Sequence, residues 1–313
     1  MLLVREELRR STTPGDHAIS IGVFDGVHRG HEELVRHLLA EAGTRNLTGG
    51  IVTFHPSPIT VLRPDISLSY LESLEQRVEL LGQLGVEYVS VLQFTSEVAQ
   101  VSARDFVRLL VEEANMRLLV VGEDFALGRG REGDADRLRE SGDELGFEVV
   151  TVPLLDASDD HISSTRVRKA LAEGEMEDVA DLLGRNYTLR GPVVHGDKRG
   201  REIGVPTLNI GVSPDRARPP NGVYITRATL PDGRQFEACT NLGMQPTFDG
   251  TRWQVETHLL NFEGDLYDAV VTVELLQRLR DEQKFDGIDA LLTQIHQDLD
   301  STRAFFAETG QRV

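Results

Sequence analysis

The amino-acid sequence predicts an α/β domain built on a mostly parallel sheet, followed by a small β-barrel domain with a C-terminal helix. The chain has 313 residues, which is long for one core and favours two domains. In the first half, short apolar runs alternate with helical patterns, whereas closely spaced strand-like runs rich in glycine and proline dominate the second half. We therefore expect one domain over residues 1–185 and another over residues 186–313.

Strands and helices alternate regularly through the first domain. Apolar runs predict strands at 18–21, 50–54, 88–94, 118–122 and 148–152, and helical spacing predicts helices at 34–42, 74–84, 106–114 and 135–145. Ser102, with Asp105 three residues later, resembles a capping box at the start of the third helix. Such alternation implies a parallel sheet covered on both faces, with ligands bound beyond the carboxyl ends of the strands.

The turn after the first strand is the feature around which the chain is organised. The strand passes through Gly22 and Gly26 into a helix, with His28, Gly30 and His31 at its start. Gly30 lets a ligand approach the backbone, and free N–H groups at a helix start favour phosphate. A single histidine near a helix start is more often a cap or a solvated residue. The whole HxGH string behind a strand and a glycine turn is the signature of nucleotidyltransferases.

The residues around this turn narrow the resemblance. The stretch 20–31, in which Phe-Asp-Gly precedes the histidines, resembles the bacterial bifunctional riboflavin kinase/FMN adenylyltransferase family, also called FAD synthetase. The resemblance implies that His28 and His31 are catalytic and act on the triphosphate and the leaving pyrophosphate. The nucleotide-binding residues that it implies here are Gly22, Phe24, Asp25, Gly26 and Gly30.

A second motif of that family follows the last strand of the domain. Residues 162–168, Ile-Ser-Ser-Thr-Arg-Val-Arg, resemble its I-S-S-T-x-x-R motif, which closes over ATP opposite the histidines. Hydroxyls at the start of a helix are also simple N-caps, but phosphate chemistry explains the arginines better. The resemblance implies a catalytic role for Arg168, whereas Arg166 is at a variable position. It also implies nucleotide contacts from Ser163, Ser164 and Thr165.

The loops after two other strands depart from the family pattern. Residues 54–58 keep its F-x-P-x-P frame, with Ser57 at a position that is often histidine. After the fourth strand, Ala-Leu at 126–127 replaces the usual Arg-Phe. The resemblance implies flavin contacts from Asp124 and Phe125 in this loop. We expect the replacements to alter flavin affinity.

The same loop contains a literal match to the dinucleotide-binding fingerprint G-x-G-x-x-G, at residues 128–133. That fingerprint belongs directly between the first strand of a domain and its helix, whereas this copy follows a strand that we expect to be the fourth. We therefore interpret it as a flexible loop near a ligand.

The second domain is predicted to be a small barrel with a helix packed on it. Its strand-like runs lie at 189–195, 222–230, 235–241, 254–260 and 269–276. One apolar helix face follows, made of Ile288, Leu291, Leu292, Ile295 and Leu299. The simplest interpretation of this helix is a lid on the barrel.

The run 196–209 is the informative stretch of the second domain. It lacks Walker A spacing, because no Gly-Lys-Ser/Thr ends it, and its glycines alone indicate a flexible turn. Thr207 and Asn209 are two hard oxygen donors on one side of an extended segment, which suits Mg²⁺ bound with nucleotide phosphates. The run resembles the riboflavin kinase motif G-x-x-x-G-R-x-x-G-x-P-T-A-N. Nucleotide contacts are thereby implied for Gly196, Gly200, Arg201 and Gly204.

Two later stretches complete the riboflavin kinase resemblance. Residues 241–248 resemble N-x-G-x-R-P-T-F, with Gln245 for the usual arginine, and residues 255–260 resemble V-E-x-H-L-L. The family assigns Glu256 the role of base, and a carboxylate within hydrogen-bond reach would help to deprotonate the primary alcohol of riboflavin. A lone glutamate on a strand is more often a solvated residue. Flavin contacts are implied for Arg280 and Phe285.

Composition limits the class of partner. A formal net charge of −18, from 33 basic and 51 acidic residues, opposes nucleic-acid binding, whose affinity depends on Lys and Arg neutralising phosphates. Cys239 is the only cysteine, so no intrachain disulfide forms; it is most simply a small core residue in a protein of the reducing cytoplasm. We find no signal segment and no apolar run near the roughly 18 residues that a membrane span needs. The expected partners are small molecules: riboflavin, FMN and ATP.

The resemblance covers residues 19–299 and implies two ATP-dependent reactions. Riboflavin would be phosphorylated to FMN in the second domain, and FMN adenylylated to FAD with release of pyrophosphate in the first. Mg²⁺ is the implied cofactor, and FMN and FAD are the products. Two alternatives stay open: a flavin-binding protein or monofunctional riboflavin kinase with a decayed adenylyltransferase half, and a transferase using CTP or another phosphorylated acceptor. No oligomeric state follows from the sequence.

Overall fold

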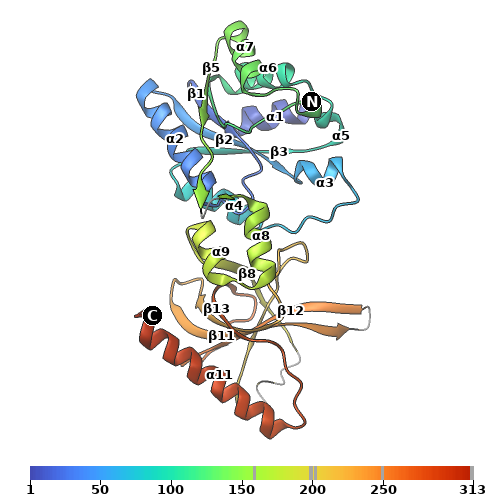
Figure 1. Cartoon of the computed structure of the whole chain (residues 1–313), viewed down its shortest axis with the longest axis vertical. Coiled ribbons are helices and arrows are strands. Elements are labelled where there is room, and N and C mark those ends of the chain that lie inside the picture. Colours follow the sequence, from blue (N-terminus) through green and yellow to red (C-terminus); the bar gives the residue numbers. More distant parts are fainter. Residues whose placement is uncertain (158–159, 197–199, 201–202, 248–249, 311–313) are drawn as a thin grey trace. The chain divides into compact units, whose positions relative to one another are not determined.

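The computed structural model contains two compact units, Met1–Ser164 and Thr165–Val313 (Figure 1). The residues that it describes are 1–157, 160–196, 200, 203–247 and 250–310. The domain boundary that the sequence predicts, between residues 185 and 186, falls later in the chain than the division between these units. That boundary stays a prediction.

The first unit is built on a five-stranded sheet with the order β3-β2-β1-β4-β5, in which every neighbouring pair is parallel. This confirms the α/β class that the alternating pattern predicts. The strands are β1 (His17–Ile21), β2 (Thr48–His55), β3 (Tyr88–Gln93), β4 (Met116–Gly122) and β5 (Glu148–Val152). Two short antiparallel strands, β6 (Asp156–Ala157) and β7 (Asp160–His161), form a separate pair.

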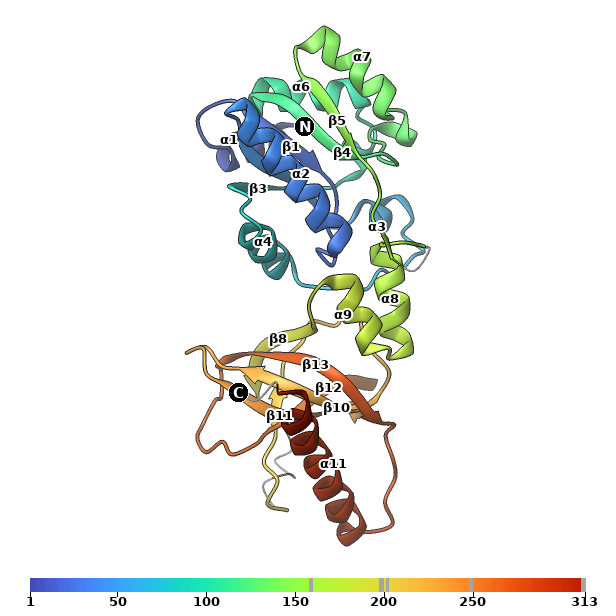
Figure 2. The same ribbon diagram turned by 60° about the vertical axis from the view of Figure 1, so that its left-hand side comes forward.

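Helices cover both faces of this sheet. They are α1 (Leu2–Ser11), α2 (Arg29–Arg45), α3 (Pro58–Leu62), α4 (Leu74–Gln83), α5 (Ser96–Ala99), α6 (Ala103–Ala114) and α7 (Ala135–Leu145), with a 3₁₀ turn, η1 (Arg129–Arg131). Successive strand residues point to opposite faces, so Ala18 joins the core under α2 and α4, whereas Ile19 joins the core under α1, α6 and α7. Figure 2 shows α2 lying against the sheet beside β1.

Local capping explains where two of these helices begin. Ser102 caps α6 by accepting a hydrogen bond from the backbone N–H of Asp105, as the sequence predicts. Ser73 and Gln76 form a complete capping box at the start of α4. The segment that leads into α4 is thereby fixed.

The strand order defines a topological switch point between β1 and β4. From β1 the chain builds outward through β2 and β3, and it then returns to the other side of β1 to form β4 and β5. The connections after β1 and β4 therefore diverge, and in open α/β sheets ligands bind in the crevice at such a point. The HxGH turn follows β1, and the loop 123–134 follows β4.

The second unit holds a closed six-stranded barrel with the order β10-β11-β12-β9-β8-β13, which confirms the predicted barrel. Its strands are β8 (Tyr187–Val194), β9 (Leu208–Ile210), β10 (Gly222–Thr229), β11 (Gln235–Thr247), β12 (Gly250–Leu259) and β13 (Val270–Arg280). The helices are α8 (Ser164–Glu173), which begins at the division between the units, α9 (Met176–Leu183) and α11 (Ile288–Thr309).

The long helix α11 packs on the barrel, as its apolar face predicts (Figure 1). Phe306 is fully buried against Ile225 and Leu276. Ile288, at the other end of the predicted face, is instead exposed. The apolar face therefore covers the barrel along most, but not all, of its predicted length.

Several elements have no counterpart in the sequence prediction, among them α1, α3, α5, the turn η1, β6, β7 and β9. Helix α1 precedes the first predicted strand, and β9 is three residues long inside a glycine- and proline-rich run. So short a strand shows no periodicity, and it exists because β8 and β12 supply its pairing partners. Strand β11 is also longer than predicted, continuing past Asn241 to Thr247.

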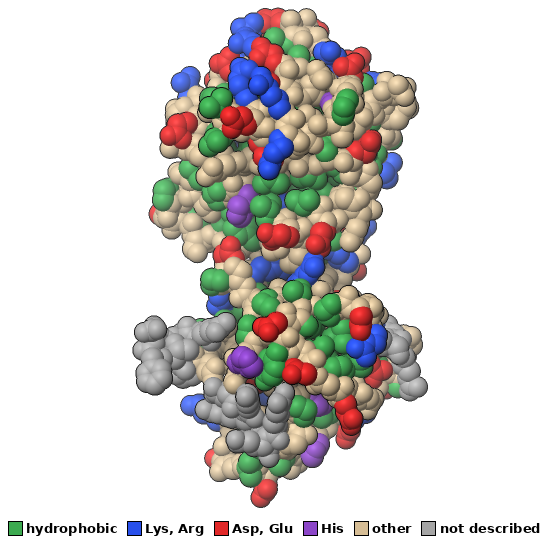
Figure 3. Space-filling view, turned by 180° about the vertical axis from the view of Figure 1, so that it is seen from behind, with side chains coloured by type: hydrophobic (Ala, Val, Ile, Leu, Met, Phe, Trp, Pro, Cys, Tyr) green, Lys and Arg blue, Asp and Glu red, His purple; other side chains and the backbone are tan. Residues whose placement is uncertain are grey.

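Charged side chains of both signs are interspersed on the face shown in Figure 3. None of the helices in the described part of the chain combines the length and apolar character that crossing a membrane requires.

Candidate active sites

The turn after β1 has an unusual backbone. Phe24, Gly26 and Val27 have φ angles of 53°, 89° and 33°, in the left-handed region. Glycine adopts this region at little cost, but Phe24 and Val27 do so only where their surroundings hold them. Phe24 is anchored because its ring is buried in the core under α2.

The two histidines of this turn lie together at the start of α2. His28 is the N-cap residue, and its Nδ1 accepts a hydrogen bond from the backbone N–H of His31 at 3.3 Å. In a neutral His28 the ring proton is therefore on Nε2. The two imidazole rings stack with centroids 3.7 Å apart and planes 17° apart. His28 therefore uses Nδ1 to cap the helix, and its Nε2 is a separate atom that can bind a ligand.

Two glycines of the turn permit close approaches. A Cβ atom on Gly30 would lie 3.2 Å from the His28 ring and 3.5 Å from the carbonyl oxygen of Ile162. A Cβ atom on Gly22 would lie 3.0 Å from the Phe24 ring. Gly30 therefore gives the His28 ring its room at the helix start.

The beginning of the 162–168 motif contacts the same turn. The hydroxyl of Ser164, the first residue of α8, donates to the backbone carbonyl of Asp25 at 2.7 Å. This brings together Ser164 and the HxGH turn, as the resemblance implies. Thr165 and Arg168 belong to the second unit, and their placement at the histidines stays a prediction.

An apolar pocket of about 200 Å³ lies at the carboxyl ends of β2 and β3. Its walls are mostly aromatic and aliphatic, and they include Phe54, Leu62, Phe94, Phe106, Leu127 and Gly128. Such a lining suits a flat aromatic ring system. The two residues predicted to bind flavin do not line it: Phe125 packs against the core, and the Asp124 carbonyl accepts from Arg131 at 3.1 Å.

The glycines of the 128–133 loop serve packing. A Cβ atom on Gly128 or Gly133 would come within 2.4 Å or 2.3 Å of Ala103 at the start of α6. Leu127 and Gly133 form an isolated antiparallel bridge, which closes the loop. The loop follows β4 and not β1, so this geometry agrees with our interpretation that it is no dinucleotide fingerprint.

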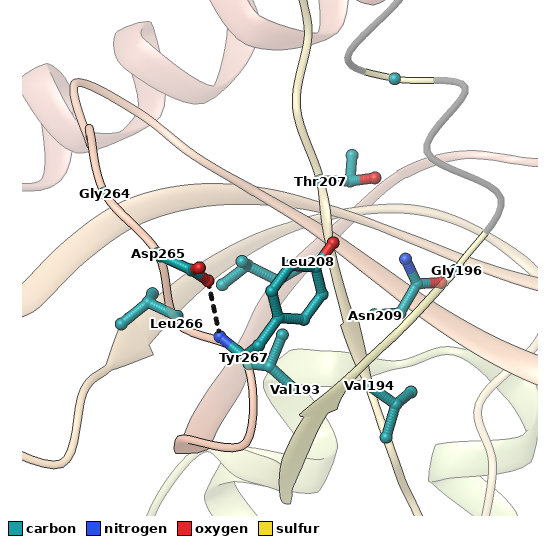
Figure 4. Close-up of a pocket in the computed structure, with 11 residues that line it drawn as sticks. Val193, Val194, Gly196, Thr207, Leu208, Asn209, Gly264, Asp265, Leu266 and Tyr267 are labelled. Atoms are coloured by element: carbon teal, nitrogen blue, oxygen red, sulfur yellow. Dashed lines mark hydrogen bonds between the residues drawn. The ribbon is translucent and has the colours of Figure 1, made fainter.

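The barrel contains a polar pocket beside β8 and β9 (Figure 4). Thr207 and Asn209 line it, and Tyr267 closes the opposite wall with its backbone N–H bonded to Asp265 at 3.0 Å. The side-chain oxygen of Asn209 accepts from Gln254 at 2.6 Å, which fixes the orientation of the amide.

A second barrel pocket, of about 320 Å³, lies between the strands and α11. Glu256, Arg280 and Phe285 all line it, so the structure brings these three predicted residues together. Gly200 and Thr207 line both barrel pockets, and Glu256 is the register partner of Asn209 across β12 and β9. The two pockets therefore meet beside the predicted base and the predicted metal ligands.

Arg280 has a structural partner in addition to its place in the pocket. Its guanidinium binds the Asp298 carboxylate of α11 through Nε at 3.0 Å and a terminal nitrogen at 2.7 Å. Cys239 lines the same pocket, and burial raises the pKa of its thiol to about 12, partly offset by a hydrogen bond with Thr302. The thiol is therefore neutral at physiological pH.

The glycines predicted to bind nucleotide lie where backbone and side chains crowd. A Cβ atom on Gly196 would overlap the Asn209 amide at 2.3 Å, and one on Gly200 would overlap the carbonyl of Val205 at 2.4 Å. Gly204 has a φ angle of 80°, which favours glycine. Arg201 lies outside the described residues.

Sequence reasoning missed several residues that line these pockets. His258 lines the larger pocket, and its Nδ1 donates to the carbonyl of Pro206 at 2.7 Å. It lies two residues after Glu256 on a strand, so the alternation of side chains places it on the same face. Asp265 and Tyr267 lie in a loop whose sequence carries no periodic signal.

A parallel α/β unit carrying HxGH is followed by a barrel with a polar pocket and a larger pocket that share Gly200 and Thr207, and this arrangement is the one expected of a two-part transferase. Family models support both parts: residues 10–166 match FAD synthetase, and residues 183–306 match riboflavin kinase. The chain belongs to the bifunctional riboflavin kinase/FMN adenylyltransferase family.

Relatives with that name align over nearly the whole chain. The Escherichia coli (strain K12) protein is 36% identical over 311 residues, covering 99% of both chains. The Listeria monocytogenes protein is 36% identical over 292 residues, covering 93% of this chain and 92% of the relative. A crystal structure titled macrolide-efflux protein, from Streptococcus pneumoniae, has a TM-score of 0.86 and 33% identity, covering 95% of this chain and 96% of that one.

Proposed function

We propose that this chain phosphorylates riboflavin to FMN with ATP in the barrel and adenylylates FMN to FAD, releasing pyrophosphate, in the α/β unit. The observation that carries the proposal is the match of both family models in succession, each over a unit that contains the corresponding motif. We assign adenylyl transfer to residues 1–185 and the kinase to residues 186–313. We also infer a cytoplasmic location, in keeping with these small, diffusible substrates. The efflux title is outweighed, because the named enzymes align over the same residues.

In the kinase reaction the nucleophile is a neutral primary alcohol. Glu256 removes its proton as the alcohol oxygen attacks the γ-phosphorus, and ADP leaves. The proposed role of Glu256 as the base is supported by its position in the larger pocket, beside the residues that this pocket shares with the polar pocket. Arg280 and Phe285 are proposed to contact the flavin.

A magnesium ion fits the polar pocket, because Thr207 and Asn209 offer hard oxygen donors and the Asn209 amide is already oriented by Gln254. When bound, it would neutralise phosphate charge during transfer. A side chain at Gly196 or Gly200 would collide with Asn209 or Val205 beside these ligands. We propose that both glycines, together with Arg201 and Gly204, contact the nucleotide.

In adenylyl transfer the nucleophile is an FMN phosphate oxygen that is already ionised, so no strong base is needed. The oxygen attacks the α-phosphorus of ATP and pyrophosphate leaves. We propose that His28, His31 and Arg168 stabilise the charge on the triphosphate and the leaving group. The stacked imidazoles at the N-terminus of α2 support this role. The remaining nucleotide contacts are proposed for the turn 22–30 and for 163–165.

The division of labour is tested by chromatographic assay of riboflavin, FMN and FAD after incubation with ATP and Mg²⁺. Glu256→Ala should slow FMN formation by about 100-fold or more, because it removes the base, while FMN-to-FAD conversion continues. His28→Ala with His31→Ala should slow FAD formation by about 100-fold or more and leave the kinase intact. Exposed Glu263→Ala and half-buried His37→Ala are matched controls that should change neither rate. Loss of both activities in a folded single-site variant would contradict the assignment.

A monofunctional riboflavin kinase is a second candidate. Leu127 lines the apolar pocket at the place where the family pattern carries an aromatic residue next to a cation, so flavin binding by the α/β unit could be lost. This candidate predicts that FMN accumulates without FAD in the same assay. Repeating the assay with CTP tests the nucleotide: our proposal expects product only with ATP.

A further inference from the structure

A buried group of charged side chains lies behind the HxGH turn, and the proposed reaction does not use it. Arg77, from α4, is 0% exposed, and Glu72 and Asp25 are 4% and 2% exposed. The Nε atom of Arg77 donates to Glu72 at 3.1 Å, and a terminal nitrogen lies 3.5 Å from the Asp25 carboxylate. Buried charges are costly, and they are retained where pairing and hydrogen bonding fix a required arrangement.

The two carboxylates hold the backbone of the turn. The N–H of Gly26 donates to both oxygens of Glu72, at 2.9 Å and 2.6 Å. The carboxylate of Asp25 accepts from the N–H of Leu71 at 3.0 Å, and the Asp25 carbonyl accepts from Ser164. Three separate segments, around residues 25, 72 and 164, are therefore joined in one cluster.

The held backbone is the strained part of the turn. Gly26 lies between Phe24 and Val27, both of which have left-handed φ angles that ordinary residues avoid. Such a strained backbone conformation persists only where several contacts with neighbouring groups hold it in place. His28 follows Val27 directly, so the constraint on Gly26 acts two residues before the first histidine of the pair.

The same guanidinium is linked to the loop after β2 through Tyr70. The Arg77 guanidinium carbon lies 5.7 Å from the centroid of the Tyr70 ring, and the Tyr70 hydroxyl accepts from the N–H of Ser57 at 2.8 Å. Ser57 belongs to the proline-framed loop that follows β2. Arg77 thus contacts residues that hold two of the loops at the carboxyl edge of the sheet.

We infer that Arg77 and Glu72 are positioning residues for adenylyl transfer: Arg77 fixes the Glu72 carboxylate, and Glu72 holds Gly26 so that His28 and His31 meet the triphosphate. This inference rests on the proposed function of the α/β unit. Arg77 and Glu72 act through the turn, and the inference assigns them no contact with substrate. Ångström-scale misplacement of catalytic groups is enough to cost about 100-fold in rate.

The test compares Arg77→Met, Arg77→Lys and Glu72→Gln with Arg36→Met, a control in which an exposed ion pair with Glu33 on α2 is removed. We expect kcat for FMN-to-FAD conversion to fall by about 10- to 100-fold in Arg77→Met and Glu72→Gln. The KM for ATP should change much less, and Arg77→Lys should recover part of the rate. Riboflavin phosphorylation by the same chain should be unchanged in every variant.

Hydrogen exchange separates positioning from general loosening of the unit. We expect faster exchange in peptides that cover residues 22–31 of the variants, with β1 and β4 unchanged. Wild-type kcat in Glu72→Gln, or exchange that rises equally through β1 and β4, would overturn the inference. Glu72→Gln keeps the shape of the side chain, so it tests the inference even if Arg77→Met does not fold. If the unmodified chain makes no FAD, the proposed function fails. The hydrogen-exchange pattern still shows whether Arg77 and Glu72 hold residues 22–31.

Discussion

At the scale of single residues, His28 caps a helix and is also the residue that we propose for phosphate binding, two roles that sequence patterns present as alternatives. Its Nδ1 caps α2 by accepting from His31, and its ring stacks on the His31 ring. The cap fixes the tautomer and the ring orientation, which are the two properties that a phosphate-binding imidazole needs. The structural role of His28 at the helix start would therefore support the catalytic role that we propose for it.

Cys239 provides a prediction at the same scale. Since burial raises the pKa of its thiol to about 12, the reactive thiolate is scarce below that pH. Iodoacetamide at pH 8 should therefore modify the folded chain far more slowly than it modifies a free thiol, and the rate should rise as pH approaches 12. Mass spectrometry measures the adduct, and the chain unfolded in guanidinium serves as the control. Rapid alkylation of the folded protein at pH 8 would show that the site is open and ionised.

Motifs predicted the residues that we propose carry the chemistry, but not the residues that we infer support them. His28 and Glu256 stand in strings whose spacing has a chemical meaning, so both could be named from the sequence. Glu72 and Arg77 have no such string, and charged residues at a helix start look solvent-facing. Their burial arises because the turn after β1 lies over α4, which is a tertiary contact that no local pattern contains.

At the scale of elements, strong periodicity predicted position well. The predicted helix 135–145 coincides with α7, and the predicted strand 148–152 coincides with β5. Strand β9 could not be predicted because its three residues depend on pairing with β8 and β12, far away in the sequence. Similarly, the close packing of the 128–133 loop on Ala103 depends on α6, so its glycines looked merely flexible.

The attachment of α11 is expected to control riboflavin binding. Asp298→Ala would remove the carboxylate that pairs with Arg280 and so weaken the attachment of α11 to the barrel. Leu291, Ile295 and Leu299 of this helix line the larger pocket. Breaking a buried ion pair lowers the free energy of unfolding by about 3–5 kcal/mol. Because Arg280 is partly exposed, we expect a decrease of about 3 kcal/mol or less. The KM for riboflavin should rise, measured by kinase assay, alongside a lower melting temperature.

A neighbouring ion pair supplies the control for α11. Asp300 pairs with Arg303 at 2.8 Å on the solvent side of the same helix, with 77% of the Asp300 side chain exposed. Asp300→Ala should therefore alter neither riboflavin KM nor stability appreciably. Equal effects of the two substitutions would show that helix propensity, and not the Arg280 contact, governs the pocket.

At the scale of the whole molecule, the described pockets divide between the two units. FMN is the product of one proposed reaction and the substrate of the other. We therefore expect a mixture of the Glu256→Ala chain and the His28→Ala, His31→Ala chain to convert riboflavin to FAD after a lag, since FMN diffuses between molecules. Each variant alone, given riboflavin, is the control and should form no appreciable FAD. Absence of FAD from the mixture would mean that FMN is not released.

The meeting of the two barrel cavities at Gly200 and Thr207 has a kinetic consequence. ATP and riboflavin, the substrates of the proposed kinase reaction, would occupy separate compartments that share Gly200 and Thr207, so neither would have to depart before the other arrives. For that reaction we therefore expect a ternary complex with direct, single-step transfer and not a ping-pong scheme through a phosphorylated enzyme.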